Sequence, residues 1–397
     1  MKIQILIVAN HLLGSDLGSG GDILFLELAR RWQRSGNDVH ILVAEAGQAT
    51  CAQVVGAQHV TVLPGSWVDD PQRYRDQLLL VALVYLLRSI RALRLIRHID
   101  ADVLYTPGDF WCDVLPAAVR KTQQRRLTWA AAIFHINDAP HRRRGNSLAA
   151  SVLSWLAQRA SFWLVKRAAD VIFPLNSSVR TALIARGWPA QKLHVNGAGL
   201  DVEKFSEIPV QPKRFTACYL GRINPTKGVF DLPAVWAIVV EKIPQSSLVM
   251  MGGGSPTWDA QLRRAIADAG MEQHVQVLGF VPSNTAYRHL KDSMLFISAS
   301  TEEGFGISAA EAMACGVPVV AYDLPAYREF FPRGMTRVPV GDTHAFAAAI
   351  IRLLTDRAFY AEQCRAALAT AAQYDWDHVA ERELEIIQRS HVGNATM

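Results

Sequence analysis

Cysteine is scarce in this 397-residue chain. The five cysteines stand at positions 51, 112, 218, 315 and 364, an odd number with no Cys-x-x-Cys pair among them. This pattern indicates neither a disulfide framework nor a zinc site, so we expect a protein of the reducing cytoplasm. No metal site and no cofactor are predicted.

Long hydrophobic runs are also lacking. The longest one spans residues 78–87, between Asp76 and Arg88, about half of the roughly 20 residues that cross a bilayer. Residues 1–9 hold a short apolar run broken by Gln4, with no cleavage site of small residues. We therefore expect a buried strand at the start instead of a signal peptide, and no membrane-spanning segment.

The charge is unevenly divided between the two halves of the chain. Residues 1–200 carry 23 Lys and Arg against 14 Asp and Glu, a net charge of +9, and the remaining 18 against 22 give −4. The length suits two domains, of which the first is basic. Nucleic-acid binding would also account for a basic half, but no RNA- or DNA-binding module is recognised.

The most informative stretch runs from residue 294 to residue 321. We expect a buried strand at 294–297, a glycine-bearing loop at 298–307, a helix at 308–314 with Ser308 as N-cap, and a strand at 317–321. Such a strand, loop and helix aim backbone N–H groups at one point, where an anion binds well. Glu303 and Glu311 flank that point and are expected to accept hydrogen bonds from sugar or ribose hydroxyls, although an isolated pair of glutamates is more often ordinary surface charge.

The residues of this stretch resemble the Glu-x7-Glu signature of glycosyltransferase family 4, whose members are retaining enzymes. The matching residues are Glu303-Gly304-Phe305-Gly306, Glu311-Ala312-Met313-Ala314 and Gly316-Val317-Pro318-Val319, and Ser308 departs from a proline often found at its place. The resemblance implies an α/β protein of the GT-B fold, with two Rossmann-like domains whose parallel sheets face each other across a cleft. The implied parts are an acceptor-side domain at 1–205, a donor-nucleotide domain at 206–375, and a helix at 376–390 that returns to the first domain.

The chain opens with a strand at 3–8, a loop at 10–21 with four glycines, and a helix at 22–35, as in the first unit of a Rossmann-like fold. Gly20 and Gly21 match the family's Gly-Gly loop beside donor phosphate and acceptor, and a simple tight turn would explain them equally well. We expect Asp100 and Asp102 to be structural, because they precede a strand instead of following it.

Two further strands, at 102–106 and 127–134, are expected to present polar side chains at their carboxyl ends, where open α/β sheets bind ligands. On the acceptor side these residues are Asp109, Trp111, Asn137 and Asp138. His135 follows the second strand and matches the histidine that the family places against donor sugar and phosphate, although such a histidine is more often scaffolding.

Basic residues alternate with apolar ones in two predicted helices of the first domain. The helix at 74–98 carries Arg75, Arg88, Arg91, Arg94 and Arg97, and a basic loop at 140–145 leads into a helix with Trp155, Phe162 and Trp163 among Arg159, Lys166 and Arg167. This pattern suits an anionic membrane interface, and a solvated face over an aromatic core fits it equally well. The first interpretation predicts peripheral attachment to the inner face of the cell membrane.

The second domain is expected to begin at residue 215, after a proline-bearing linker at 205–213. Arg222 and Lys227 follow its first strand and are expected to neutralise the charge of a diphosphate. The alternative interpretation is that both are ordinary surface charges. The residues expected to bind the donor are Gly20, Gly21, Gly221, Arg222, Lys227, Gly253, Val281, Glu303, Gly304, Phe305, Gly306, Ile307 and Glu311.

Together with these features, the resemblance to glycosyltransferase family 4 implies transfer of a hexose from a nucleotide sugar, such as a GDP- or UDP-hexose, to a hydroxyl of a lipid-linked or other glycan. Glu303, His135, Arg222 and Lys227 are the expected catalytic residues. The alternatives are a small soluble acceptor, a non-catalytic sugar-nucleotide-binding protein, and an epimerase or phosphorylase on the same fold.

Overall fold

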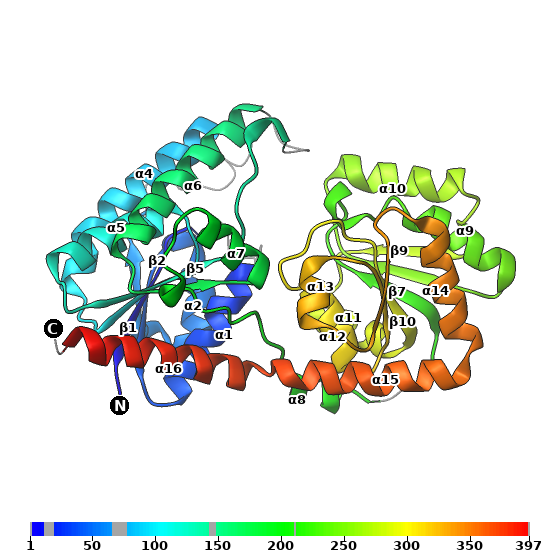
Figure 1. Ribbon diagram of the computed structural model, residues 1–397. Coiled ribbons are helices and arrows are strands. Elements are labelled where there is room, and N and C mark those ends of the chain that lie inside the picture. Colours follow the sequence, from blue (N-terminus) through cyan, green and yellow to red (C-terminus); the bar gives the residue numbers. More distant parts are fainter. Residues whose placement is uncertain (1, 12–19, 66–77, 143–147, 210–211, 396–397) are drawn as a thin grey trace. The chain divides into compact units, whose positions relative to one another are not determined.

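The computed structural model describes residues 2–11, 20–65, 78–142, 148–209 and 212–395. The chain forms two compact units, each with one parallel six-stranded sheet and flanking helices (Figure 1). Unit 1 comprises residues 1–198 and 376–397, and unit 2 comprises residues 199–375.

The sheet of unit 1 has the strand order β3-β2-β1-β4-β5-β6, and all neighbouring strands are parallel. Its strands are β1 Gln4–Ala9, β2 Asp38–Ala44, β3 Val60–Leu63, β4 Val103–Thr106, β5 Thr128–Ile133 and β6 Val171–Pro174. Every residue of β4, β5 and β6 is buried, as expected for strands covered on both faces. The order reverses between β1 and β4, and ligands of such sheets bind at the carboxyl ends beside this switch point.

The helices of unit 1 are α1 Gly20–Arg34, α2 Gln48–Val55, α4 Leu78–Leu95, α5 Trp111–Gln123, α6 Leu148–Ala168, α7 Ser177–Ala185 and α16 Trp376–Ala395. The helix α5 packs against both α4 and α6. No helix in the described part of the chain is long and apolar enough to span a bilayer.

The last helix, α16, belongs to unit 1 and packs along α1 (Figure 1). The indole nitrogen of Trp32 donates to Ala380 O at 3.0 Å. Asn196 donates to Glu383 Oε2 at 2.6 Å and accepts from Arg382 Nε at 2.7 Å. These contacts fix the chain to unit 1 where it leaves that unit and where it returns.

Unit 2 repeats the same topology, with the strand order β12-β11-β10-β7-β8-β9 and parallel pairing throughout. Its strands are β7 Phe215–Leu220, β8 Leu248–Met251, β9 Val275–Gly279, β10 Ser293–Ser298, β11 Val319–Tyr322 and β12 Met335–Val338. The switch point therefore lies between β7 and β10.

The helices of unit 2 are α8 Val202–Glu207, α9 Leu232–Lys242, α10 Pro256–Asp268, α11 Ser283–Lys291, α12 Ile307–Ala314, α13 Pro325–Phe330, α14 Thr343–Thr355 and α15 Arg357–Ala371. A continuous apolar core between sheet and helices includes the buried Trp236, Tyr322 and Phe346. The alternation of parallel strands and helices in two units thus agrees with the fold class expected from the sequence.

Four local predictions were wrong. Residues 20 and 21 were expected in a loop but begin α1. The N-cap of α12 is Gly306 and not Ser308, because Gly306 turns the chain into the helix with a φ of 101°. Part of the expected linker at 205–213 is the helix α8, which buries Phe205. The last helix was expected to end at residue 390, yet α16 continues to Ala395, and Asn394 donates to Thr128 Oγ1 at 3.2 Å.

The carboxylate of Asp102 has a structural role, as predicted. Its Oδ2 accepts a hydrogen bond from Gln4 N at 2.9 Å and so joins the amino ends of β1 and β4. Among the described residues, no group of three or more His, Cys, Asp or Glu side chains is arranged to hold a metal ion.

Candidate functional site

The switch point of unit 2 brings a cation and a carboxylate together. Lys227 Nζ lies 2.6 Å from Glu303 Oε1, and Ser300 Oγ donates to the same oxygen at 2.8 Å. Lys227 follows β7 and Glu303 follows β10, so the pair lies at the carboxyl ends of the two strands that flank the switch point. Arg222, the other expected cation, is exposed in the same loop after β7.

The backbone explains why these two loops meet. A Cβ on Gly228, whose φ is 60°, would lie 1.8 Å from Ala299 O, so only glycine allows this approach. Thr301 N donates to Thr226 O at 2.9 Å and holds the loops together. The side chain of Asn224 accepts from Lys227 N at 3.0 Å and begins the short turn that carries the lysine.

The loop after Glu303 is anchored by an aromatic cluster. Phe305 is buried against Phe330, Phe331 and Tyr374, with ring centroids 4.8 to 5.3 Å apart. Phe305 was expected to bind the donor, and because its ring belongs to this cluster, its backbone is the part that could do so. A Cβ on Gly306 would lie 2.5 Å from the Tyr327 ring, so glycine is required at the start of α12. Gly304 precedes these two residues in the anchored loop, and Ile307 follows them as the first residue of α12.

Glu311 lies in the middle of α12 and contacts α11. Tyr287 Oη donates to Glu311 Oε1 at 3.1 Å, and burial raises the pKa of the Glu311 carboxyl to about 7. The Tyr287 ring packs edge-on against Phe205 at 4.8 Å, and Lys204 Nζ lies 4.9 Å from its centroid. The carboxyl group keeps acceptor capacity for a further hydroxyl.

The remaining donor-side glycines have a structural explanation. A Cβ on Gly252 would lie 1.9 Å from Gly221 O, so the loops after β7 and β8 touch through their backbones. Gly253 follows Gly252 in the loop after β8, and a Cβ added to it would meet only Phe280, at 4.0 Å. Val281 is half-buried next to Phe280, whose side chain is 85% exposed. The loops after β7 and β8 thus approach each other through their backbones, and the loop after β9 presents the exposed ring of Phe280.

In unit 1, Gln158 connects the carboxyl ends of β4 and β5. Its amide nitrogen donates to Asp109 Oδ2 at 2.6 Å and to His135 O at 3.1 Å, and its oxygen accepts from Asn137 N at 2.7 Å. Gln158 is 6% exposed. Gln158 was not predicted from the sequence, although a glutamine within the apolar pattern of α6 was a usable signal.

The structure places the other residues expected near the acceptor at the same edge of the sheet. Trp111 begins α5 and is half-buried, whereas Asp138 and His135 are exposed. The His135 ring has no hydrogen-bond partner in the described part of the chain. Gly21 lies close to the same edge, because a Cβ there would meet the Phe134 ring at 2.7 Å; Gly20 starts the same helix.

A second missed cluster lies directly after β1. His11 Nδ1 is 2.7 Å from Asp113 Oδ2, and its Nε2 is 3.2 Å from Asp22 Oδ1. The imidazole also stacks on Phe110, with centroids 4.6 Å apart. Burial alone would lower the pKa of His11, but the two carboxylates outweigh it and raise this pKa to about 9. A histidine that directly follows a buried strand was the available signal.

The arginine pattern of α4 was interpreted incorrectly at one position. Arg88 was expected on an anion-attracting surface, yet it is 1% exposed and donates to Asn10 O at 2.8 Å. A long apolar helix can bury one guanidinium where a strand end offers it a carbonyl. Arg91 donates to Pro64 O at 2.8 Å, and Arg75 lies outside the described residues.

Two parallel sheets with the same strand order, each with its switch point at a strand-loop-helix junction, define the class as the GT-B fold of glycosyltransferases. Solved structures support this: the chain aligns with HepE of Anabaena in complex with UDP and glucose over 98% of this chain and 100% of that one, with a TM-score of 0.74 and 18% identity. Sucrose-phosphate synthase from Thermosynechococcus elongatus aligns over 98% and 99%, with a TM-score of 0.76 and 18% identity.

The family follows from sequence comparison. The model "Glycosyltransferase Family 4" matches residues 18–204, and the model "Glycosyl transferases group 1" matches residues 201–373. The chain belongs to glycosyltransferase family 4.

The alignments with curated relatives cover about half of this chain. A GDP-mannose:cellobiosyl-diphosphopolyprenol alpha-mannosyltransferase of Xanthomonas oryzae pv. oryzae is 30% identical over 199 residues, 49% of this chain and 52% of the relative. A phosphatidyl-myo-inositol mannosyltransferase of Mycolicibacterium smegmatis is 30% identical over 217 residues, 52% and 55% of the two chains. The chain spans about half the length of the curated relatives it matches.

Proposed function

We propose that the protein is a retaining hexosyltransferase that uses a nucleotide-diphosphate sugar. The observation that carries this proposal is the Lys227–Glu303 pair at the switch point of unit 2, with Arg222 in the same loop. The two cations suit a diphosphate leaving group, and the carboxylate suits hydroxyls of the donor sugar. Two relatives support a nucleotide sugar as donor and a lipid-linked molecule as acceptor. One is named as a mannosyltransferase that uses GDP-mannose, and the other as a phosphatidyl-myo-inositol mannosyltransferase.

In the proposed reaction the acceptor hydroxyl attacks the anomeric carbon on the face that the leaving group departs from. The leaving diphosphate takes the acceptor proton, so no carboxylate nucleophile is required. Lys227 and Arg222 stabilise the charge that develops on the leaving group, Glu311 accepts from the ribose, and His135 contacts sugar and phosphate. The reaction needs no metal, because the two cations take its place.

The test of this assignment is steady-state kinetics of Lys227→Ala and Arg222→Ala. Each variant should lower kcat more than it raises KM, by about 10- to 150-fold, since a charge-assisted hydrogen bond contributes about 1.5 to 3 kcal/mol. Lys242→Ala is the control, because Lys242 is an exposed lysine at the end of α9. A rise in KM with unchanged kcat would mean that the two cations bind the donor equally well in the ground state and the transition state. That result would contradict their proposed role on the leaving group.

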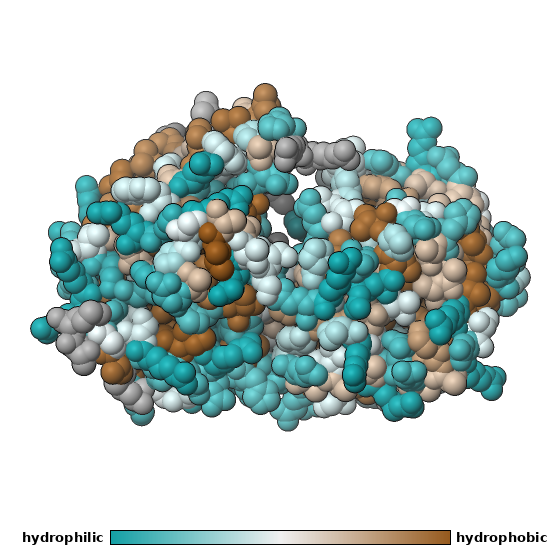
Figure 2. Space-filling model, in the orientation of Figure 1, coloured by the Kyte–Doolittle hydropathy of each residue, from teal (hydrophilic) through white to brown (hydrophobic). Residues whose placement is uncertain are grey.

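The proposed acceptor is a lipid-linked or other glycan at an anionic membrane surface, and exposed apolar residues of unit 1 support it. They are spaced along one face of two helices, in α4 at Leu83, Leu86 and Ile90 and in α6 at Leu148, Val152, Leu156 and Trp163. Figure 2 shows hydrophobic residues over α4 and α6 along the upper left edge of the molecule. This face suits the headgroup region of a bilayer.

The electrostatic part of this attachment loses one expected cation, because Arg88 is buried. The side chains of Arg142, Arg143 and Arg144 lie outside the described part of the chain. The cations of α4, α6 and the turn after α4 that are exposed are Arg94, Arg97, Arg159, Lys166 and Arg167. At about 1 kcal/mol for each cation near an anionic surface, these side chains would add to the apolar contact.

Vesicle co-sedimentation tests the membrane proposal. Leu86→Gln/Ile90→Gln and Leu156→Gln/Trp163→Gln should each reduce the fraction bound to vesicles that contain phosphatidylglycerol. Leu368→Gln is the control, because Leu368 is 50% exposed on α15 of unit 2. Wild-type protein that ignores such vesicles at low salt would make a soluble acceptor the better assignment.

A further inference from the structure

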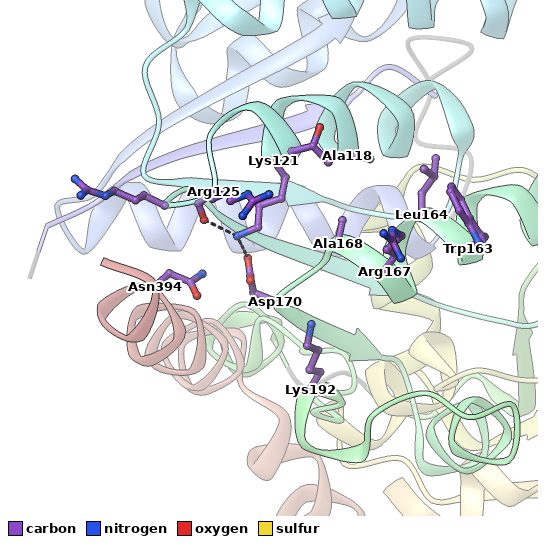
Figure 3. Close-up of a pocket in the computed structure, with 12 residues that line it drawn as sticks. Ala118, Lys121, Arg125, Trp163, Leu164, Arg167, Ala168, Asp170, Lys192 and Asn394 are labelled. Carbon is purple, nitrogen blue, oxygen red and sulfur yellow. Dashed lines mark hydrogen bonds and ion pairs between the residues drawn. The ribbon is translucent and has the colours of Figure 1, made fainter. Parts of the chain in front are cut away.

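Unit 1 contains a cavity of about 810 Å³ that none of the proposed catalytic residues lines. Its walls are the carboxyl ends of α5 and α6, the segment before β5, and residues Asp170, Lys192 and Asn394 (Figure 3). It therefore lies at the amino ends of β5 and β6, at the opposite edge of the sheet from Asp109 and His135.

The charge of this cavity is strongly one-sided. Asp170 is its single acidic residue. The basic residues that line it are Lys121, Arg125, Arg126, Arg167 and Lys192.

The two lysines already have partners. Lys121 Nζ donates to Leu127 O at 2.6 Å and to Arg125 O at 3.0 Å, and it lies 2.7 Å from Asp170 Oδ2. Lys192 Nζ donates to Ala169 O at 2.7 Å. Figure 3 shows Lys121 between the Arg125 backbone and Asp170. The lysines thus offset Asp170 and the carbonyl oxygens that follow α5 and α6, the negative ends of those helices.

The three arginines that line the cavity take no part in these lysine contacts. Arg125, Arg126 and Arg167 are exposed, and in the described part of the chain none of their guanidinium groups has an acidic or carbonyl partner. Like charges gathered at one cavity repel each other, and a bound anion removes that repulsion. Guanidinium groups bind both phosphate and carboxylate oxygens in a bidentate manner, and the higher charge of a phosphate matches three arginines better than a single carboxylate does.

One wall of the cavity is apolar. Trp163 is 64% exposed, and Leu164 and Ala168 continue the wall along α6 toward Arg167. In Figure 3 Trp163, Leu164 and Arg167 lie at the same side of the cavity. An indole beside a guanidinium suits a ligand whose phosphate is joined to an apolar or planar group.

We propose that this cavity is a second anion site, which binds a phosphate-bearing ligand through Arg125, Arg126 and Arg167. The ligand is either a free diphosphate compound or the headgroup of an anionic lipid. The site is made by unit 1 alone and shares no residue with the Lys227–Glu303 site of unit 2.

The test is calorimetric titration with inorganic diphosphate. All proteins carry Arg222→Ala/Lys227→Ala, so that diphosphate bound at the proposed donor site does not contribute. Adding Arg125→Gln/Arg167→Gln should raise the dissociation constant at least about tenfold. The charge-matched control is Arg34→Gln/Arg263→Gln, two exposed arginines outside the cavity, and it should stay within about twofold.

A second arm identifies the source of the phosphate. The same proteins are sedimented with phosphatidylcholine vesicles, with and without phosphatidylglycerol. Loss of diphosphate binding in the cavity variant supports a free ligand, and loss of vesicle binding alone supports a lipid headgroup. If the background protein binds neither probe, or if cavity and control variants behave alike in both arms, the proposal is overturned.

Discussion

The pairing of Lys227 with Glu303 leads to a prediction that separates the roles of these two residues. A donor diphosphate must take Lys227 Nζ away from a carboxylate 2.6 Å distant. Glu303→Gln keeps the size of the side chain and an acceptor for Ser300, but it removes the charge. The variant should therefore lose transfer and keep, or improve, its affinity for a nucleoside diphosphate.

The structure sets the expected magnitudes. The two side chains are 21% and 14% exposed, so the pair is neither fully solvated nor fully buried. Discounted for solvent screening, it is worth about 1 kcal/mol, and its loss should raise nucleoside diphosphate affinity about fivefold. The charged carboxylate accepts hydrogen bonds from donor-sugar hydroxyls, and loss of these charge-assisted bonds, about 1.5 to 3 kcal/mol, should lower kcat about 10- to 150-fold.

Calorimetry with UDP and GDP, together with turnover of the donor, measures both effects. Glu302→Gln is the matched control, because Glu302 is an exposed neighbour in the same loop. A tenfold or greater fall in nucleoside diphosphate affinity would assign Glu303 to the nucleotide. Unchanged turnover would remove Glu303 from the site altogether.

Glu311, Gln158, His11 and the metal-free reaction each allow a further test. Glu311→Ala should weaken nucleoside diphosphate binding, as measured by calorimetry, and unchanged affinity would exclude a ribose contact. Gln158→Ala and Gln158→Glu should both raise KM for the acceptor and leave KM for the donor unchanged, because each loses the hydrogen bond that positions Asp109; equal changes in both constants would indicate a merely structural role. The raised pKa of His11, about 9, contributes stability that is complete below pH 6.5 and is lost as pH rises through 9. This loss should lower wild-type stability to urea by up to about 3 kcal/mol across that window, and the fall should be smaller by that amount in His11→Gln. Transfer should survive EDTA, and restoration by Mg²⁺ after its loss would contradict a metal-free reaction.

The places of the candidate site residues of unit 2 in the fold could be predicted from the sequence, but their pairing could not. Glu303 and Lys227 each follow a predicted strand, which is enough to place them at a ligand-binding edge. Their contact depends on Gly228, which lets one loop approach Ala299 O. Nothing in a single sequence indicates that a glycine permits such an approach.

Side chains whose contacts depend on tertiary burial could not be placed from the sequence. The ring of Phe305, a residue of a sequence signature, packs against Phe330, Phe331 and Tyr374. Arg88 shares the spacing of exposed arginines, yet it donates to the end of β1. In both cases the partners are distant in the chain, so periodicity could not reveal them.

The buried His11 cluster was missed for the same reason. His11, Asp22 and Asp113 come from the end of β1 and from two different helices, and only the switch point of the sheet brings them together. A motif search along the chain treats each as a lone polar residue. The parallel strand order, once known, places β1 and α5 at one edge.

The most direct test of the proposed activity is product analysis with a panel of GDP- and UDP-hexoses and lipid-linked or soluble glycan acceptors. The protein should release nucleoside diphosphate from at least one donor, and proton NMR of the product should give the same anomeric configuration as the donor. Thermal stabilisation by nucleotide sugars without transfer to any acceptor, or a product of inverted configuration, would contradict the account.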